Sequence, residues 1–145
     1  MTNTIFLQPV LALIIWTLMI GLWMYATRIP AMQKAGIDPQ EATQPGKGDW
    51  RDKIPASVHW KADNYNHLHE QPTLFYALML FIALTGGADQ IALYLGWAYV
   101  GLRVVHSLIQ VTINKVMARF SVFFLSNTVL IVLAVKEAIR VFGQG

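Results

Sequence analysis

Apolar and polar stretches alternate along the chain in a pattern that predicts membrane-spanning helices. Residues 5–27 contain no charged side chain and exceed the length of about 20 helical residues that crosses a hydrocarbon core. Two further apolar stretches of sufficient length cover residues 90–113 and 120–140. The apolar run 74–84 is too short alone, so the helix that contains it must begin near Asp63 and cover residues 63–85. The pattern therefore predicts four spanning helices.

The second predicted helix carries polar side chains into the membrane. Asp63, Asn66 or His67, and Glu70 recur at positions i, i+3 or i+4, and i+7, which places them on one helical stripe. A carboxylate at this depth costs roughly 2.5–3.5 kcal/mol on insertion scales. We therefore expect this stripe to face partners inside the bundle.

The third predicted helix carries a matching stripe of Arg103, His106 and Gln110. Neighbouring antiparallel helices with a rise of about 1.5 Å per residue bring Glu70 and Arg103 to within about one turn in depth. His106 then lies level with Asn66 and His67, and Gln110 lies level with Asp63. The two stripes predict an intramembrane ladder whose deepest rung is a Glu70–Arg103 ion pair, formed either within one chain or between subunits.

Residues 28–62 differ in composition from the predicted spans. Four prolines punctuate the segment, namely Pro30, Pro39, Pro45 and Pro55, which is typical of an exposed loop without a packed core. This loop and the connector before residue 120 hold eight of the eleven Lys and Arg residues: Arg28, Lys34, Lys47, Arg51, Lys53, Lys61, Lys115 and Arg119. Because basic loops favour the cytoplasmic side, we predict a cytosolic loop and two non-cytoplasmic termini.

Composition supports a single membrane domain over residues 1–145. The chain is 55% hydrophobic and 13% charged, which is too apolar for a soluble domain and predicts the lipid bilayer as its surroundings. It has no cysteine, so disulfides and a cysteine nucleophile are excluded. The net charge of +3 is too diffuse for nucleic-acid binding. His59, His67 and His69 lack a convincing ligand spacing, so we predict no metal site.

The order of several short motifs resembles a known family. Glu70 is followed by Pro72 and Phe75, the third helix contains Arg103-Val-Val-His-Ser-Leu, and the next junction contains Asn114-x-Val-x-x-Arg119-Phe. This arrangement resembles the MAPEG family, the membrane-associated proteins in eicosanoid and glutathione metabolism, and its bacterial branch most of all. The resemblance implies an all-α, four-helix up-and-down bundle that forms a homotrimer in a bacterial inner membrane. It also implies that glutathione binds in a polar cleft between subunits near the cytosolic face.

The resemblance also implies roles for individual residues. Glu70 matches the acid that pairs with the glutathione amine, and Lys61 falls where the family often has an arginine for a carboxylate. Arg119 lies close to the arginine that steadies the thiolate, and Arg103 matches the arginine of the third helix, so both are candidate catalytic residues. Where catalytic relatives have tyrosines, this chain has His106 and Gln110. The predicted glutathione-binding set is Lys61, Asn66, His67, Glu70, Arg103, His106 and Gln110.

Two classes of function are compatible with the sequence. In the first, the protein is a glutathione transferase or peroxidase that acts on lipophilic electrophiles, with an arginine raising the thiolate fraction of the bound thiol. In the second, it is a non-enzymatic bundle, either a lipid-binding scaffold or a small proton or ion pathway, and the Glu70–Arg103 pair only fixes helix register. The apolar far half of each span favours a cleft over a pathway.

Overall fold

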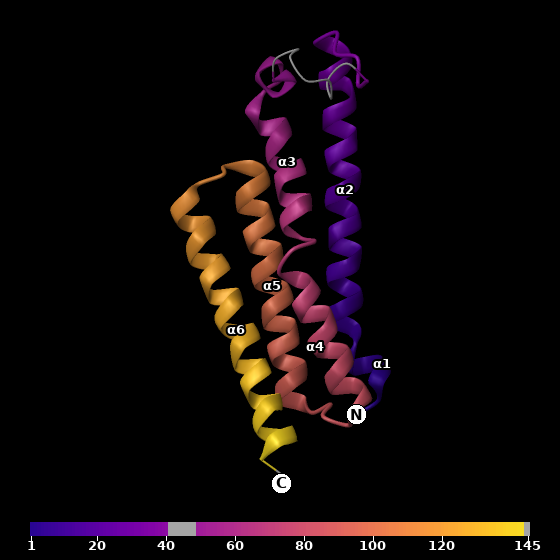
Figure 1. The fold of residues 1–145 in the computed structure, drawn as a ribbon, viewed down its shortest axis with the longest axis vertical. Helices are drawn as coiled ribbons and strands as arrows, with labels where there is room; N and C mark the ends of the chain where they lie inside the picture. The colour runs from indigo at the N-terminus through magenta and orange to yellow at the C-terminus, as the bar shows by residue number, and fades with distance from the viewer. Residues whose placement is uncertain (41–48, 144–145) are drawn as a thin grey trace.

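The computed structural model describes residues 1–40 and 49–143, and within them the chain is helical without any β-strand. Figure 1 shows an elongated bundle in which both termini lie at the same end. The elements in chain order are α1 (Asn3–Phe6), α2 (Gln8–Lys34), the 3₁₀ helix η2 (Trp50–Lys53), α3 (Ala56–His67), α4 (Pro72–Leu84), α5 (Gln90–Thr112) and α6 (Val116–Phe142).

Three of these helices, α2, α5 and α6, are long and apolar enough to cross a membrane. They correspond to the first, third and fourth predicted spans. Many of their large apolar side chains lie on the outer surface, such as Leu22 at 70% exposed and Met117 at 74% exposed. Exposed apolar surface of this kind is expected where lipid is the solvent. The prediction of an all-helical integral membrane protein is therefore confirmed.

The second predicted span, 63–85, is not one continuous helix. It is divided between α3, which begins at Ala56, and α4, which begins at Pro72, with a break over residues 68–71. Proline lacks the backbone donor that a helix interior needs, so Pro72 is accommodated in the first turn of a new helix, where that donor has no partner anyway. Since α4 has only 13 residues, neither part qualifies as a span, and the predicted count of four spans is not confirmed.

The loop predicted for residues 28–62 is shorter than expected. Helix α2 continues through Pro30 to Lys34, and α3 already begins at Ala56. Pro30 removes the helical donor to the carbonyl of Ala26, but Ala26 is exposed near the end of the helix, where the loss is tolerated. Pro45 and Lys47, which contributed to the loop prediction, lie outside the described residues.

Helices α3 and α4 lie end to end between α2 and α5, and α6 packs along α5 (Figure 1). The apolar core collects residues from α2, α4 and α5, including Leu13, Phe75 and Tyr99, each with no exposed surface. The rings of Phe75 and Tyr99 stack with centroids 4.5 Å apart. This contact anchors the start of α4 on α5, directly below the break in the second helical segment.

A group of polar and charged side chains joins α6 to the turn between α4 and α5. We call this group the terminal clasp (Thr85, Asp89, Lys136, Glu137 and Arg140). Glu137 is only 2% exposed and accepts hydrogen bonds from Lys136 at 3.0 Å and Arg140 at 2.7 Å. Lys136 also pairs with Asp89 at 2.7 Å, while Arg140 donates to the hydroxyl and carbonyl oxygens of Thr85. Every charge in the clasp therefore has an opposite charge as a partner.

Candidate functional site

The predicted polar stripe of α5 is present and buried. Arg103 is 1% exposed, His106 is 3% exposed and Gln110 is 1% exposed. Their spacing places them on one face of α5, which packs toward the break between α3 and α4 and toward α6. These three residues were correctly predicted to face inward.

Gln110 forms the upper rung of the site with two residues of α3. Its side-chain oxygen accepts a hydrogen bond from Asn64 Nδ2 at 2.9 Å, and its amide lies within hydrogen-bonding distance of His67 Nδ1. Asn64 has no exposed surface, whereas Asp63, which was predicted to lie level with Gln110, pairs with Arg51 at 3.1 Å, and Asn66 is exposed. The side chain that faces α5 is therefore Asn64, one that the sequence pattern missed.

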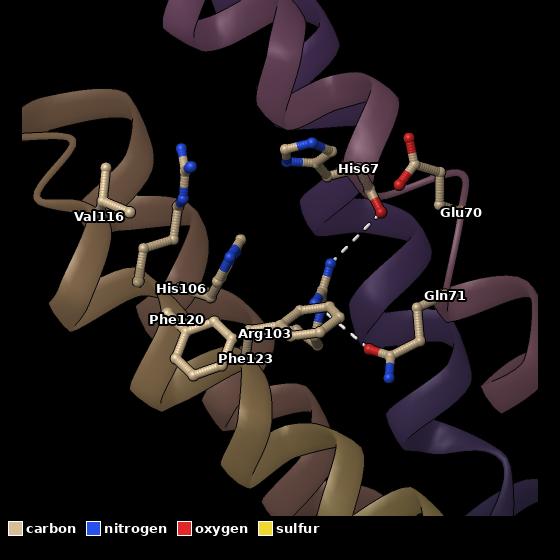
Figure 2. Close-up of a pocket in the computed structure, with 9 residues that line it drawn as sticks. His67, Glu70, Gln71, Arg103, His106, Val116, Phe120 and Phe123 are labelled. Carbon is tan, nitrogen blue, oxygen red and sulfur yellow. Dashed lines mark hydrogen bonds between the residues drawn. The ribbon is translucent and has the colours of Figure 1, made fainter.

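Arg103 lies at the centre of the site without a carboxylate partner. Its Nη2 donates to the carbonyl oxygen of His67 at 3.3 Å, and its Nη1 donates to Gln71 Oε1 at 3.4 Å (Figure 2). Both distances exceed the usual range of about 2.7–3.2 Å for N–H···O hydrogen bonds. Within the described part of the chain, Arg103 Nε has no hydrogen-bond partner at all. The hydrogen-bonding groups of this buried guanidinium are therefore only partly satisfied.

Glu70 and Arg103 do not form an ion pair within the described part of a single chain, and a pair between subunits stays a prediction. Glu70 lies in the break between α3 and α4 and is exposed, and none of the ion pairs formed by the described residues joins it to Arg103. A continuous helix would have kept Glu70 on the same stripe as Asn66. The break changes the rotation of the chain after His67, so Gln71 takes the position beside Arg103.

A pocket of about 280 Å³ opens next to Arg103, between the helix break, α5 and α6. We call it the arginine pocket. Its walls combine cationic, polar and aromatic side chains, namely His67, Glu70, Gln71, Arg103, His106, Val116, Arg119, Phe120 and Phe123. Figure 2 shows Arg103 reaching from α5 toward His67 and Gln71, with Phe120 and Phe123 on the α6 side. The aromatic ring of Phe123 lies 5.7 Å from the Arg103 guanidinium carbon.

Arg119 reaches the arginine pocket because of the turn between α5 and α6. Asn114 in this turn has a φ of 46°, a left-handed conformation that asparagine tolerates better than most residues. Its side-chain oxygen accepts a hydrogen bond from Arg119 Nη1 at 2.7 Å. The two candidate catalytic arginines therefore line the same pocket, one from α5 and one from the first turns of α6.

Other predicted residues lie outside the arginine pocket. Lys61 donates to the carbonyl oxygen of Ser57 at 2.8 Å, and its amine lies 5.5 Å from the centre of the Trp23 ring on α2. Asn66 is exposed, and Gln110 is occupied by the rung described above. The chain thus brings together His67, Glu70, Arg103, His106 and Arg119, but not Lys61, Asn66 or Gln110.

Gln71 is a functional candidate that the sequence pattern missed. Its side-chain oxygen accepts from both Arg103 and Tyr99, and its Nε2 donates to Asn127 Oδ1 of α6 at 2.6 Å. The residue thereby joins the start of α4 to α5 and α6 at the floor of the arginine pocket. The available signal was its position directly before Pro72, because proline is favoured at the first position of a helix.

One further atom in the site lacks a partner. His106 Nδ1 is buried and has no hydrogen bond within the described residues, and it lies on the same wall of the pocket as Arg103 Nε. Buried polar atoms are usually satisfied by protein, water or a bound molecule. Two side chains that line the arginine pocket are therefore incompletely satisfied by the described protein groups.

These features define a helical integral membrane protein with a cationic pocket between its helices. The sequence model of the MAPEG family matches residues 6–139, nearly the whole chain, and the protein belongs to this family. No curated protein and no solved structure matches the chain.

Proposed function

We propose that this protein is a glutathione-dependent transferase or peroxidase that acts on lipophilic electrophiles entering from the bilayer. The observation that carries the proposal is Arg103, a buried cation that has no carboxylate partner in the described chain and faces an open pocket. Buried charges in a membrane protein are kept where a partner or a function compensates their cost. An anionic ligand supplies that compensation.

Glutathione matches the chemistry of the arginine pocket. It has two carboxylates, one amine and one thiol, and the pocket offers Arg103 and Arg119 as cations and Glu70 as an acid. Within the described chain Glu70 forms no ion pair, so its carboxylate is available for the glutathione amine. His67 and His106 supply further hydrogen-bonding nitrogens, and Phe120 and Phe123 provide an apolar wall for the second substrate.

The size of the pocket supports a site that is completed by a neighbouring subunit. At about 280 Å³ it lies at the lower limit of about 300–1,000 Å³ typical of small-molecule sites. The start of α6 beside it exposes large apolar side chains, including Met117 at 74% and Phe124 at 63% exposed. We propose that these side chains pack against another subunit of a homotrimer, which closes the pocket and contributes further contacts to glutathione.

The proposed chemistry begins with the thiol. An arginine beside the sulfur stabilises the thiolate relative to the thiol, whose reference pKa is about 8.5, and so raises the nucleophilic fraction at neutral pH. In an addition to an α,β-unsaturated carbonyl compound, a sulfur electron pair forms the S–C bond at the β-carbon, the C=C π bond breaks, and the displaced electron pair moves onto the carbonyl oxygen as an enolate. Arg119 or Arg103 stabilises this oxyanion, and the proton lost from the thiol returns to carbon in the product.

A non-enzymatic bundle is the alternative, and the rung formed by Asn64, His67 and Gln110 favours it. Gln110 bonds to both Asn64 and His67 within the chain, as expected of a structural contact between α3 and α5, and Asn64 Oδ1 has no partner among the described residues. An ion pathway is less well supported than a scaffold, because the segment beyond the helix break is apolar from Leu74 to Leu84. A scaffold does not bind glutathione, so replacement of Arg103 or Arg119 then has no binding to reduce.

Glutathione binding to detergent-purified protein tests the proposal by isothermal titration calorimetry. We expect saturable binding to the wild type and at least a tenfold loss of affinity in Glu70→Gln, which keeps the size of the side chain but removes the charge. Lys34→Gln, an exposed change at the end of α2, is the matched control and retains wild-type affinity. Absence of binding to a folded wild type refutes the enzyme proposal and leaves the scaffold.

A further inference from the structure

The guanidinium of Arg103 bridges the break between α3 and α4. Its Nη2 donates to the carbonyl oxygen of His67, the last residue of α3, and its Nη1 donates to the side chain of Gln71, directly before α4 (Figure 2). The carbonyl groups of a last helical turn lack donors from a following turn of the same helix. The interrupted helix therefore presents two uncharged oxygens to one buried cation.

The side chain of Gln71 is itself held by two further helices. Its Oε1 accepts from the hydroxyl of Tyr99 on α5 at 3.3 Å, besides accepting from Arg103 at 3.4 Å, and its Nε2 donates to Asn127 Oδ1 on α6 at 2.6 Å. Tyr99 has no exposed surface, and its ring stacks on that of Phe75 with centroids 4.5 Å apart. Contacts with α5 and α6 thus fix where the acceptor for Arg103 lies.

Arg103 also sets the direction of these hydrogen bonds. A guanidinium carries donors only, so Gln71 must turn its oxygen toward α5 and its amide nitrogen toward α6. Asn127 must then present its oxygen to that nitrogen. The opposite orientation of Gln71 would place its NH2 group against the cation. The network therefore has one favourable arrangement, in which Arg103 receives an uncharged acceptor.

An uncharged acceptor positions Arg103 without compensating its charge. None of the ion pairs formed by the described residues includes Arg103, whereas the equally buried Glu137 has two cationic partners. Glutamate has nearly the size of glutamine, and a carboxylate oxygen in place of Gln71 Oε1, 3.4 Å from Arg103 Nη1, would form an ion pair. The amide of Gln71 therefore decides whether Arg103 remains available to an anion.

We propose that Gln71 is the positioning residue of the arginine pocket, which holds the Arg103 guanidinium in place and leaves its positive charge for an anionic group of glutathione. This inference rests on the proposed function and assigns a role to a residue that carries no charge itself. The other titratable side chains that line the pocket are His67, Glu70, His106 and Arg119. Glu70 is the one carboxylate among them and forms no ion pair within the described chain, so it does not compensate Arg103.

Two variants of Gln71 with similar side-chain size test the inference. Gln71→Met removes the hydrogen-bonding atoms, whereas Gln71→Glu keeps an acceptor but adds a negative charge. By isothermal titration calorimetry at neutral pH, we expect Gln71→Met to bind glutathione more weakly than the wild type. Gln71→Glu should bind it most weakly of all, with a loss of roughly ten- to a hundredfold, because a hydrogen bond to a charged group contributes about that factor.

Thermal unfolding without glutathione should give the opposite order of the two variants. The introduced carboxylate pairs with Arg103, so Gln71→Glu should unfold at a higher temperature than Gln71→Met. Gln33→Glu makes the same change of charge at an exposed position of α2 and is the matched control. It should resemble the wild type in both measurements.

A purely structural role of Gln71 predicts a different result. If the side chain only ties α4 to α5 and α6, then Gln71→Glu, which still accepts hydrogen bonds, binds glutathione at least as well as Gln71→Met, and this order overturns the inference. A wild type that binds no glutathione refutes the proposed function instead. Unfolding alone then decides the inference, since a higher unfolding temperature of Gln71→Glu than of Gln71→Met supports an uncompensated cation beside Gln71. A lower unfolding temperature of Gln71→Glu overturns the inference in either case.

Discussion

Two groups of side chains in this bundle each contain one deeply buried charge, and they differ in how completely that charge is paired. In the terminal clasp, Glu137 is paired with Lys136 and Arg140, and Lys136 is also paired with Asp89. In the arginine pocket, Arg103 is as deeply buried as Glu137 but forms only two long hydrogen bonds to uncharged oxygens. Arg103 and Glu137 are therefore similarly buried, but among the described residues only Glu137 has partners of opposite charge.

This difference separates a structural role from a ligand-binding role. A closed network of opposite charges leaves no group free to bind a molecule, and its removal is expected to affect folding. An unpaired cation beside a cavity contributes little to folding but offers a strong anchor for an anion. The comparison predicts that changes in the clasp lower stability without affecting glutathione, whereas changes at Arg103 affect glutathione more than stability.

The largest loss of stability is expected for Glu137→Ala. This change leaves Lys136 with Asp89 alone and Arg140 without a carboxylate, and each of the two hydrogen bonds lost by these charged groups is worth about 1.5–3 kcal/mol. Reversible unfolding in mixed micelles measures the loss. Asp52→Ala, which removes an exposed carboxylate, is the control and should change stability by less than about 0.5 kcal/mol. Equal stability of the two variants would show that the clasp does not hold α6 in place.

A smaller loss is expected for Gln110→Leu, which tests whether the upper rung is structural like the clasp. The change leaves the buried amide of Asn64 without its partner, at a cost of about 1–3 kcal/mol. The double variant Asn64→Leu with Gln110→Leu should recover part of that loss, because neither polar partner remains unsatisfied. Thermal unfolding of both variants measures this recovery, and a double variant that is less stable than the sum of the single changes contradicts it.

Gly87→Ala tests the packing of the clasp from the side of the α4–α5 turn. A Cβ atom there would lie 2.6 Å from Arg140 Nη2 and from Glu137 Oε2. Both atoms end flexible side chains, but they are held by hydrogen bonds that must break if they move, so we expect a loss of about 1–2 kcal/mol. Gly101→Ala on α5 has open space around its Cβ and is expected to raise stability by up to about 1 kcal/mol. Thermal unfolding of the two variants should therefore shift in opposite directions.

The smallest effect concerns the pH dependence of the clasp. Burial raises the pKa of the Asp89 carboxyl, but hydrogen bonds from Lys136 and from the backbone at Ala92 outweigh it and hold the pKa below its ordinary value of 3.8. The stability that Asp89 contributes is therefore complete above that value and is lost as the pH falls through the lower pKa of the folded state. Asp89→Asn should be less stable than the wild type at neutral pH, and the difference should shrink as the pH is lowered below about 4. A difference that grows on acidification contradicts this assignment.

The polar stripe of α5 could be predicted from sequence because α5 is one regular helix. Arg103, His106 and Gln110 keep helical spacing over the whole segment, so their shared face follows directly from the period. The predicted stripe on the second segment failed for the opposite reason. The break after His67 changes the rotation of the chain, so Gln71 and not Glu70 lies beside Arg103. Within α3 itself, His67 of the predicted stripe reaches Gln110, whereas Asn64 and not Asn66 is buried.

The terminal clasp could not be predicted from sequence because it depends on a long-range contact. In the sequence, Glu137 and its basic neighbours fall at the end of the predicted span 120–140. Their partners Thr85 and Asp89 lie some fifty residues earlier, in a turn whose position against α6 is set by how α5 and α6 pack. Local spacing carries no information on that placement.

The most direct test of the contrast between the two regions is thermal unfolding of Arg103→Leu and Glu137→Gln with glutathione raised from zero to the millimolar range. A ligand that binds only the folded state stabilises it by about 2.7 kcal/mol at a hundredfold excess over its Kd. We predict that Arg103→Leu unfolds near the wild-type temperature but gains nothing from glutathione, whereas Glu137→Gln unfolds earlier but gains as much as the wild type. If Arg103→Leu unfolds as early as the clasp variant and glutathione stabilises none of the three proteins, the arginine pocket is structural and the account is wrong.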